Sequence, residues 1–245
     1  MLYQLQKSNF VLVLYRISNL IDESPRVRRF FLQPVHEQDT INFIPGQFII
    51  LQKELKDGEI PLQRSYSIAN IETDVKEIEL CIVINETGVF TPWLFSLNIG
   101  DEILGSEPQG LFNLSEVSPS VPYIFVCTGT GVAPFRSMIQ KVLNESNNHV
   151  YLVFGNRIEE DILYREYWES LSDKQEQFTF IPTLSRVSKW MGRTGYVHNI
   201  YSELLEKGED ARIYVCGWQE MCKETRTNLK SMGYNRRQYH FEQYD

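Results

Sequence analysis

The pattern of apolar segments changes near residue 115, and this change constrains the fold more than any other feature of the sequence. Before it, short β-rich runs such as Val27–Leu32, Gln47–Leu51 and Ile78–Ile84 are separated by turn residues. After it, apolar strands such as Tyr123–Cys127 alternate with amphipathic helices such as Pro134–Leu143. Regular short strands favour a closed barrel or a sandwich, whereas alternating strands and helices favour a parallel sheet.

We therefore expect two domains, an N-terminal antiparallel β-barrel over residues 1–116 and a parallel-sheet α/β domain over residues 121–245. The linker is expected within Leu114–Pro122, where Ser and Pro concentrate. One helix is expected inside the barrel domain, with Thr91 as its cap and Pro92 at its first helical position. The other expected elements are strands at Tyr66–Ala69, Val150–Phe154, Phe178–Pro182 and Arg212–Cys216, and helices at Ile162–Leu171, His198–Leu205 and Gln219–Met232.

Composition and charge exclude several classes of function. A net charge of −8 with no long basic run disfavours nucleic-acid binding. The longest apolar runs are too short for a membrane span, and Arg16 interrupts the N-terminal patch without a cleavage site, so we expect a cytoplasmic protein with no signal peptide. The four cysteines form no CxxC pair, which argues against a metal or iron–sulfur site and favours reduced thiols.

A glycine-rich segment, CTGTGVAPF at Cys127–Phe135, follows the first strand of the second half and opens a helix at Pro134. Gly129 and Gly131 allow the backbone to approach a pyrophosphate closely, and the backbone N–H groups at a helix start favour negative charge. Thr128 and Thr130 are therefore expected to line a dinucleotide site. The alternative is a tight strand-to-helix turn that binds no ligand.

Two further segments in the first half could bind a phosphorylated ring system. In RSYSIAN, Arg64 could pair with a phosphate, Tyr66 could stack on a planar ring, and Ser67 could donate a hydrogen bond. Strand alternation places Arg64 and Tyr66 on one face and Ser67 on the other. In ETGVFTPW, Gly88 precedes a predicted helix start that could receive a phosphate. A barrel strand with a surface arginine and a simple capped helix are the alternatives.

These three segments occur in one chain in the order found in the ferredoxin–NADP reductase family, which the sequence resembles from about Arg26 to its C-terminus. That family also contains oxygenase reductases and flavin reductases. The matches include RxYS, GxxS/T and GTGxAP, together with PGQF at Pro45–Phe48 and PQGLF at Pro108–Phe112. Gln109 stands where an aromatic residue is usual in the family.

The resemblance implies that the first domain binds FAD. Arg64 would hold a flavin phosphate, Tyr66 would pack on the isoalloxazine, and Ser67 would donate to flavin N5. The FAD pyrophosphate would lie against Gly88, Val89 and Thr91. CIVIN at Cys81–Asn85 has no basic or aromatic residue for the adenine, which leaves FMN as an alternative to FAD.

The resemblance also implies a nicotinamide site in the second domain. Cys216 and Gly217 in YVCGWQEM would lie beside the nicotinamide, so Ser67, Cys216 and Tyr66 are the expected catalytic residues. Ser185, Arg186 and Arg193 resemble the segment that grips the 2′-phosphate of NADP, a role that suits cationic groups and a hydroxyl. FGNR at Phe154–Arg157 is followed by the acidic run Glu159–Asp161, so NADP(H) is expected with NAD(H) second.

The C-terminal segment HFEQYD, His240–Asp245, resembles the family's last strand, and Tyr244 would cover the flavin face opposite Tyr66. Packing against the sheet is the alternative role for Tyr244. Glu242 could supply the acidic residue that some members of the family hold near the flavin. The resemblance therefore predicts aromatic and acidic side chains beside the flavin.

The expected function is an FAD-dependent oxidoreductase that moves hydride between NADPH and flavin and single electrons to or from ferredoxin or flavodoxin. The reductase component of an oxygenase and a free-flavin reductase are the enzymatic alternatives, and a non-catalytic flavin-binding electron-transfer subunit is the alternative of another class. A monomer is expected. Acidic carriers need a positive patch, for which the candidates are Arg26, Arg28 and Arg29, or Arg236 and Arg237.

Overall fold

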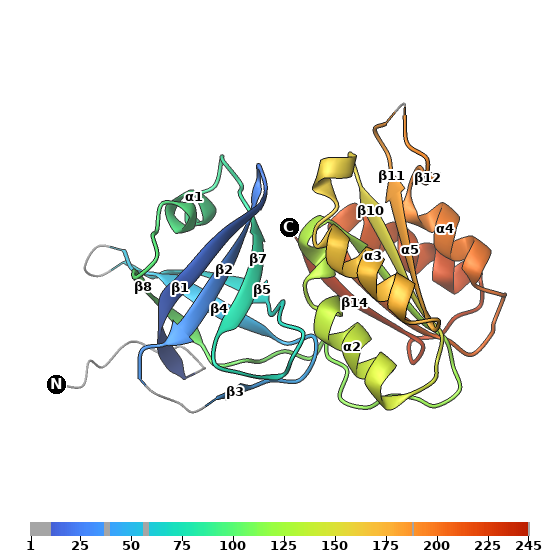
Figure 1. Ribbon diagram of the computed structural model, residues 1–245, viewed down its shortest axis with the longest axis horizontal. Coiled ribbons are helices and arrows are strands. Elements are labelled where there is room, and N and C mark those ends of the chain that lie inside the picture. Colours follow the sequence, from blue (N-terminus) through green and yellow to red (C-terminus); the bar gives the residue numbers. More distant parts are fainter. Residues whose placement is uncertain (1–10, 37–39, 56–58, 188, 245) are drawn as a thin grey trace.

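The computed structural model describes residues 11–36, 40–55, 59–187 and 189–244. It confirms the expected fold class, because an antiparallel six-stranded sheet precedes a parallel six-stranded sheet that carries helices. The two parts lie side by side, and the C-terminal strand ends near the first of them (Figure 1). The predicted barrel's first ten residues and Asp245 lie outside the described residues.

The first sheet closes into a barrel. Its strand order is β5-β4-β8-β1-β2-β7, and the ends meet through a bridge between Ile68 and Leu80 and a hydrogen bond from Ala69 N to Glu79 O of 2.8 Å. Inward-facing side chains such as Phe30 and Ile49 are fully buried, as alternation along a barrel strand requires. The strands are β1 (Leu12–Ser24), β2 (Val27–Pro34), β4 (Phe48–Lys53), β5 (Leu62–Ser67), β7 (Ile78–Val83) and β8 (Glu102–Ser106), with a separate pair β3 (Ile41–Asn42) and β6 (Asp74–Val75).

The second sheet is parallel in the order β12-β11-β10-β9-β13-β14. Its strands are β9 (Tyr123–Thr128), β10 (Val150–Asn156), β11 (Phe178–Leu184), β12 (Arg193–Thr194), β13 (Arg212–Trp218) and β14 (Tyr239–Tyr244). The helical elements are η1 (Gly129–Val132), α2 (Phe135–Glu145), η2 (Glu159–Asp161), α3 (Arg165–Lys174), α4 (Val197–Leu204) and α5 (Gln219–Ser231). Helices cover both faces, with α2 and α3 in front of the sheet and α4 and α5 behind it (Figure 1). This explains why strands such as β9 are apolar on both faces.

The strand order also locates a crevice. The chain enters the sheet at β9, runs outward through β10 and β11, and then returns to the other side of β9 with β13. Ligands of open α/β sheets bind at such a reversal, outside the carboxyl ends of the strands. Thr128 and Trp218, the last residues of β9 and β13, mark this position.

Three predicted element boundaries are wrong. Helix α1 (Phe90–Phe95) has Val89 as its N-cap, so Thr91 lies inside the helix and does not cap it. The strand that carries Tyr66 and Ser67 was expected over Tyr66–Ala69. In the structure this strand, β5, runs over Leu62–Ser67 because it pairs along β4. Helix α3 begins at Arg165, because Tyr164 has φ 56° and interrupts the helical pattern that the sequence shows from Ile162.

Candidate functional site

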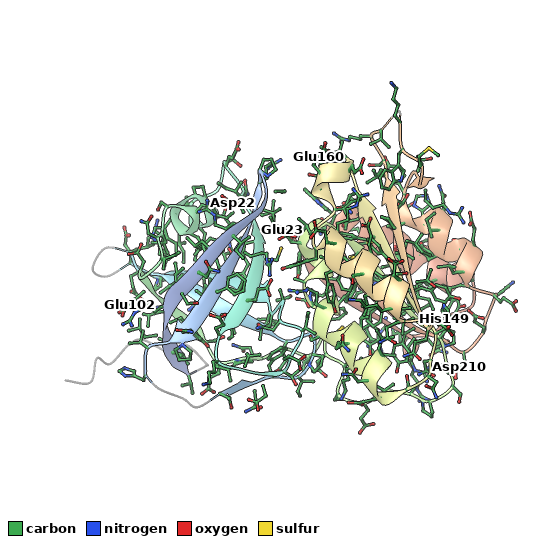
Figure 2. The ribbon with its side chains drawn as sticks, viewed as in Figure 1. Asp22, Glu23, Glu102, His149, Glu160 and Asp210 are labelled. Carbon is green, nitrogen blue, oxygen red and sulfur yellow. The ribbon has the colours of Figure 1, made fainter. Side chains whose placement is uncertain are left out.

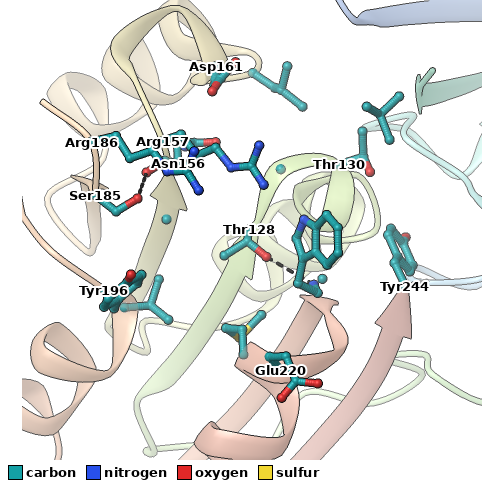
Figure 3. A pocket seen from close by; sticks show the side chains of 18 of the residues that line it. Thr128, Thr130, Asn156, Arg157, Asp161, Ser185, Arg186, Tyr196, Glu220 and Tyr244 are labelled. Carbon is teal, nitrogen blue, oxygen red and sulfur yellow. Dashed lines mark hydrogen bonds between the residues drawn. The ribbon is translucent and has the colours of Figure 1, made fainter. Parts of the chain in front are cut away.

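A cavity of about 580 Å³ opens at the crevice between the two domains. The α/β domain supplies most of its wall, and the barrel contributes a few residues from β1, β2 and β7. Figure 3 shows the ends of β9, β10 and β13 converging on it. Its lining residues include Arg26, Thr128, Thr130, Asn156, Arg157, Ser185, Arg186, Tyr196, Gly217, Trp218 and Tyr244.

The glycines at this crevice have two different tasks. Gly129 has φ 52°, and a Cβ built on it meets nothing within 4 Å, so its surroundings leave open space. A Cβ on Gly131 would clash with the carbonyl oxygen of Cys216, and one on Gly217 would clash with Thr128 Oγ1. Gly131 and Gly217 therefore allow the two strand ends to touch, a constraint that acts without any ligand.

Strand β14 brings two side chains to the predicted flavin strand. The Tyr244 hydroxyl donates to Ser67 Oγ at 2.6 Å, and Ser67 Oγ donates to Glu242 Oε1 at 3.3 Å. Ser67 is only 5% exposed. Glu242 Oε2 is buried with no hydrogen-bond partner among the described residues. Residues 175 or more positions apart in sequence thus form one polar chain with a free acceptor at its end.

Burial changes the acid–base properties of this polar chain. Desolvation raises the pKa of Glu242 to about 7, although the hydrogen bond from Ser67 lowers it. Desolvation raises the pKa of the Cys216 thiol well above its ordinary value, and the nearby Glu242 raises it further. Cys216 is therefore a neutral thiol, unsuited to nucleophilic attack. Its side chain is fully buried, so it packs behind the cavity, which Gly217 lines.

The other residues of the predicted flavin strand differ in exposure. Arg64 is exposed, and its guanidinium donates to the neighbouring Gln63 carbonyl oxygen at 2.7 Å. Tyr66 is half-buried, and its ring lies 6.1 Å from that of Phe90 on α1. The phenol thus has one side packed and part of its surface free.

The loop before α1 is closed by Thr91. Its hydroxyl accepts from Asn85 N at 2.9 Å and donates to Asn85 O at 3.2 Å. Val89 is 62% exposed, and Gly88 lies outside the left-handed region. The Gly88 N–H is already engaged, because it donates to Asn85 O at 3.0 Å. The Thr91 side chain shapes the loop, and the exposed Val89 lies at the start of α1.

One end of the cavity is basic. Arg157 and Arg186 are exposed there, and Ser185 Oγ donates to Asn156 O at 3.3 Å (Figure 3). Asn156 is 8% exposed, and its Nδ2 has no partner within the described residues, so it has a donor to offer to a ligand. Tyr196, 65% exposed, lines the same cavity.

Arg193 does not join this group. Its guanidinium pairs with Glu203 at 2.7 Å and lines a separate exposed groove beside α4. Arg193 was expected in the same site as Ser185 and Arg186, and the structure separates it from them. Short strand β12 pairs with β11 and places Arg193 next to an acidic helix residue, which a sequence motif cannot reveal.

Two exposed aromatic residues of the cavity lay outside the sequence-based prediction. Trp218 is 58% exposed, and its backbone N donates to Thr128 Oγ1 at 3.2 Å. Tyr196 follows the predicted Arg193 segment directly. Their position at or just after strand ends was the available signal, because residues there face the crevice of an α/β sheet.

The arginines considered for a docking patch are mostly engaged elsewhere. Arg29 pairs with Glu79 at 2.7 Å inside the domain interface, and Arg28 pairs with Asp22 at 2.6 Å. Arg26 lines the cavity. The prediction that Arg29 contributes to a docking patch is therefore wrong, because the buried Glu79 carboxylate holds its guanidinium.

The described residues contain neither a helix that could span a membrane nor a cluster of side chains that could bind a metal ion. None of the helices in ranges 11–36, 40–55, 59–187 and 189–244 is long and apolar enough to cross a bilayer. In the same ranges, three or more His, Cys, Asp or Glu residues nowhere gather in a way that could hold a metal ion.

Comparison with protein-family models divides the chain as the fold does. Residues 15–114 match the oxidoreductase FAD-binding domain, and residues 125–227 match the oxidoreductase NAD-binding domain. Ser67 lies in the first of these segments and the glycine loop at Thr128 in the second, whereas Glu242 and Tyr244 follow the second segment. The cavity therefore lies between a flavin module and a nicotinamide dinucleotide module.

Curated relatives and solved structures agree with this division. Ferredoxin–NADP reductase B of Sorangium cellulosum is 34% identical over 212 residues, which cover 83% of this chain and 86% of the relative. The anthranilate 1,2-dioxygenase electron transfer component of Acinetobacter baylyi is 27% identical over 77% of this chain, but the match covers only 54% of that protein. The chain is also similar to the structure of a ferredoxin NADP⁺ reductase from Neisseria gonorrhoeae with bound FAD and NADP. The TM-score is 0.81 at 23% identity, and the match covers 95% of this chain and 98% of the Neisseria chain.

Proposed function

Because this chain belongs to the ferredoxin–NADP reductase family and is an FAD- and nicotinamide-dinucleotide-binding oxidoreductase, we propose that it exchanges hydride with NADPH and single electrons with ferredoxin or flavodoxin. Residues 1–116 form the flavin-binding domain in this proposal, and residues 121–245 form the nucleotide-binding domain. The observation that carries the proposal is the meeting of Ser67 with Glu242 and Tyr244 beside the cavity.

The residues of the barrel fit a flavin. Arg64 offers an exposed guanidinium to a phosphate, and Tyr66 offers a partly free ring face. The loop at Gly88 and Val89 is closed by Thr91 and by the bond from Gly88 N to Asn85 O, and it would place the exposed Val89 and the start of α1 against the pyrophosphate. The partnerless Glu242 Oε2 is the buried polar atom that a neighbouring group would satisfy.

The residues of the α/β domain fit NADP(H). Thr128, Gly129, Thr130, Gly131 and Pro134 form the turn between β9 and α2 that would receive the pyrophosphate. The partnerless Nδ2 of Asn156 lies in the same cavity and supplies a donor.

The basic end of the cavity would hold the 2′-phosphate. Arg157 and Arg186 with Ser185 provide two cations and a hydroxyl there, and Tyr196 provides a ring face for the adenine. We assign the second cation to Arg157 instead of Arg193, which Glu203 neutralises. NADP(H) is therefore preferred over NAD(H).

Bound FAD supplies the redox chemistry, since it takes up a hydride and returns the electrons singly. The chain contributes positioning. Ser67 would present its hydroxyl to the flavin ring, and Cys216, buried behind Gly217, would support the wall of the nicotinamide pocket. Tyr244 would cover a face of the flavin ring, and its bond to Ser67 sets where that hydroxyl points. Burial raises the pKa of Glu242 to about 7, so this carboxyl, which accepts a hydrogen bond from Ser67, can hold or give up a proton.

Several weaker observations complete the proposal. Four buried free thiols suit a reducing compartment, so a cytoplasmic location is proposed. A monomer is proposed as well. With Arg28 and Arg29 engaged, Arg26 and the pair Arg236 and Arg237 are left as candidates for meeting an acidic carrier. Arg26 lies at the cavity, so it is the more useful of these for electron transfer.

The test is reduction of the purified yellow holoprotein by NADPH and by NADH under anaerobic conditions. We expect rapid bleaching with NADPH, slower bleaching with NADH, and electron delivery to ferredoxin or flavodoxin that weakens as salt rises. A protein that stays oxidised with both dinucleotides would refute the proposal. Bleaching with transfer only to an oxygenase component would favour the alternative suggested by the Acinetobacter relative.

A further inference from the structure

A buried charged cluster joins the two domains, and its residues lie outside the motifs of the proposed site. It consists of Glu79 on β7, Arg29 on β2, Arg136 on α2, Tyr164 before α3, and Glu23 on β1. Glu79 and Arg136 are each 5% exposed. Figure 2 shows Glu23 on the side of the barrel that faces the α/β domain. Buried charges are costly unless they are paired, so this cluster requires an explanation.

Arg136 makes several direct contacts between the domains. One nitrogen of its guanidinium donates to Ala69 O at 2.6 Å and pairs with Glu79 Oε2 at 2.8 Å. Its guanidinium carbon lies 4.0 Å from the centre of the Tyr164 ring. Three different contacts on one buried side chain leave it little freedom to move.

The other side of the cluster holds Glu79 in place from the barrel and from α3. Arg29 Nε donates to Glu79 Oε1 at 2.7 Å, and the Tyr164 hydroxyl donates to the same oxygen at 2.9 Å. The backbone N of Tyr164 in turn donates to Glu23 Oε1 at 2.7 Å. Tyr164 adopts its left-handed φ of 56° where it makes these contacts, so local backbone strain accompanies a domain contact.

The positions of Arg136 and of its partner Ala69 show which parts of the two domains the cluster connects. Arg136 is the second residue of α2, directly after the glycine-rich turn that ends β9. Ala69 lies two residues after Ser67, and its own N–H donates to Glu79 O at 2.8 Å. A single side chain thus connects the dinucleotide loop to the end of the flavin strand.

From this connection we infer that Arg136 is a positioning residue for hydride transfer. It fixes the separation between the strand that carries Ser67 and the loop that carries the nicotinamide half of the dinucleotide. Hydride transfer is steeply sensitive to such separations, since a displacement of about 1 Å can cost on the order of 100-fold in rate. This inference rests on the proposed function.

A positioning role predicts a different pattern from a purely structural one. The adenine end of the cavity, with Ser185 and Arg186, comes from β11 and the loop after it and receives no contact from Arg136. Loss of Arg136 should therefore lower kcat and leave adenine-end affinity unchanged. A general loss of structure would lower FAD content, affinity and rate together.

The experiment compares R136M and R136K with the wild-type holoprotein. K141M is the control, because Lys141 lies on the same helix in an exposed pair with Glu145 at 2.6 Å. Stopped-flow bleaching by NADPH measures hydride transfer, equilibrium titration with 2′-phospho-AMP measures the adenine end, and absorbance measures FAD content. We expect R136M to slow bleaching about tenfold or more, and R136K to recover part of the rate because it keeps the charge but loses the planar fork.

The expected pattern includes FAD content and 2′-phospho-AMP affinity within about twofold of wild type in both variants, and a wild-type rate in K141M. Bleaching in R136M at the wild-type rate would overturn the inference, as would a parallel loss of 2′-phospho-AMP affinity. Should R136M fail to fold, R136K decides, and a rate within about twofold of wild type then overturns the inference. A wild-type holoprotein that NADPH does not bleach would instead refute the proposed function.

Discussion

Replacing Glu242 with Gln should change how the stability of the protein depends on pH. The carboxyl is buried, its Oε2 has no partner among the described residues, and its pKa is raised from 4.5 to about 7. An acid whose folded-state pKa is raised binds more protons in the folded state than in the unfolded state. The free energy of unfolding therefore falls as pH rises between about 4.5 and about 7.

The size of this effect follows from the shift. A shift from 4.5 to about 7 corresponds to a loss of about 3 kcal/mol across the window for this one group. E242Q lacks the titration, so its stability relative to wild type should rise by that amount as pH increases through the window. Ser67 keeps an acceptor in the Gln side chain, so the packing of β14 is conserved.

Urea unfolding of apoprotein and holoprotein at several pH values from about 4.5 to 8 measures the difference. E176Q is the matched control, because Glu176 is exposed and its loss should leave the pH dependence of wild type unchanged. Parallel stability curves for wild type and E242Q would show that the pKa of this carboxyl is the same in the folded and unfolded states, and would refute the reasoning from burial.

Three further outcomes are expected. R186A should weaken 2′-phospho-AMP binding about tenfold in a calorimetric titration, whereas R193A should change it less than about twofold because Glu203 already pairs with Arg193; equal effects would contradict the assignment of the basic end. G217A should lower the melting temperature by the equivalent of about 1–3 kcal/mol, since the residue has φ 137° and a Cβ would clash with Thr128, and an unchanged melting curve would contradict this. S67A should slow stopped-flow bleaching by NADPH about tenfold or more, and an unchanged rate would remove Ser67 from the mechanism.

Much of the fold could be predicted from the sequence because its elements depend on local patterns. The α/β strands are continuous apolar runs, and the predicted starts of β9, β10, β11 and β13 match the structure. The start of α1 was wrong because Thr91 forms its bonds to Asn85 across the loop, and no local rule distinguishes this from a cap. Tyr164 escaped prediction because its left-handed backbone comes with contacts to Glu23 and Glu79 in the other domain.

The site was less predictable than the fold, since its residues meet only through tertiary contacts. The glycine turn could be found because it is continuous in sequence. The neutralisation of Arg193 by Glu203 depends on a two-residue strand placed against a helix. Gly131 and Gly217 were predicted to bind the dinucleotide. Both are also required by packing, because a Cβ on Gly131 would clash with Cys216 O and one on Gly217 with Thr128 Oγ1. Such requirements depend on three-dimensional packing and leave no separate mark on the sequence.

The narrow closure of the barrel at Ile68 and Leu80 has a consequence for how the protein keeps its prosthetic group. The two edges of the barrel sheet meet there through one β-bridge, the Ala69–Glu79 hydrogen bond and two hydrogen bonds of the Asn70 side chain, and the bridge lies one residue beyond Ser67. Local opening of a protein starts where few hydrogen bonds must break. The rate at which the Ala69 amide exchanges with solvent should therefore follow the rate at which the flavin escapes.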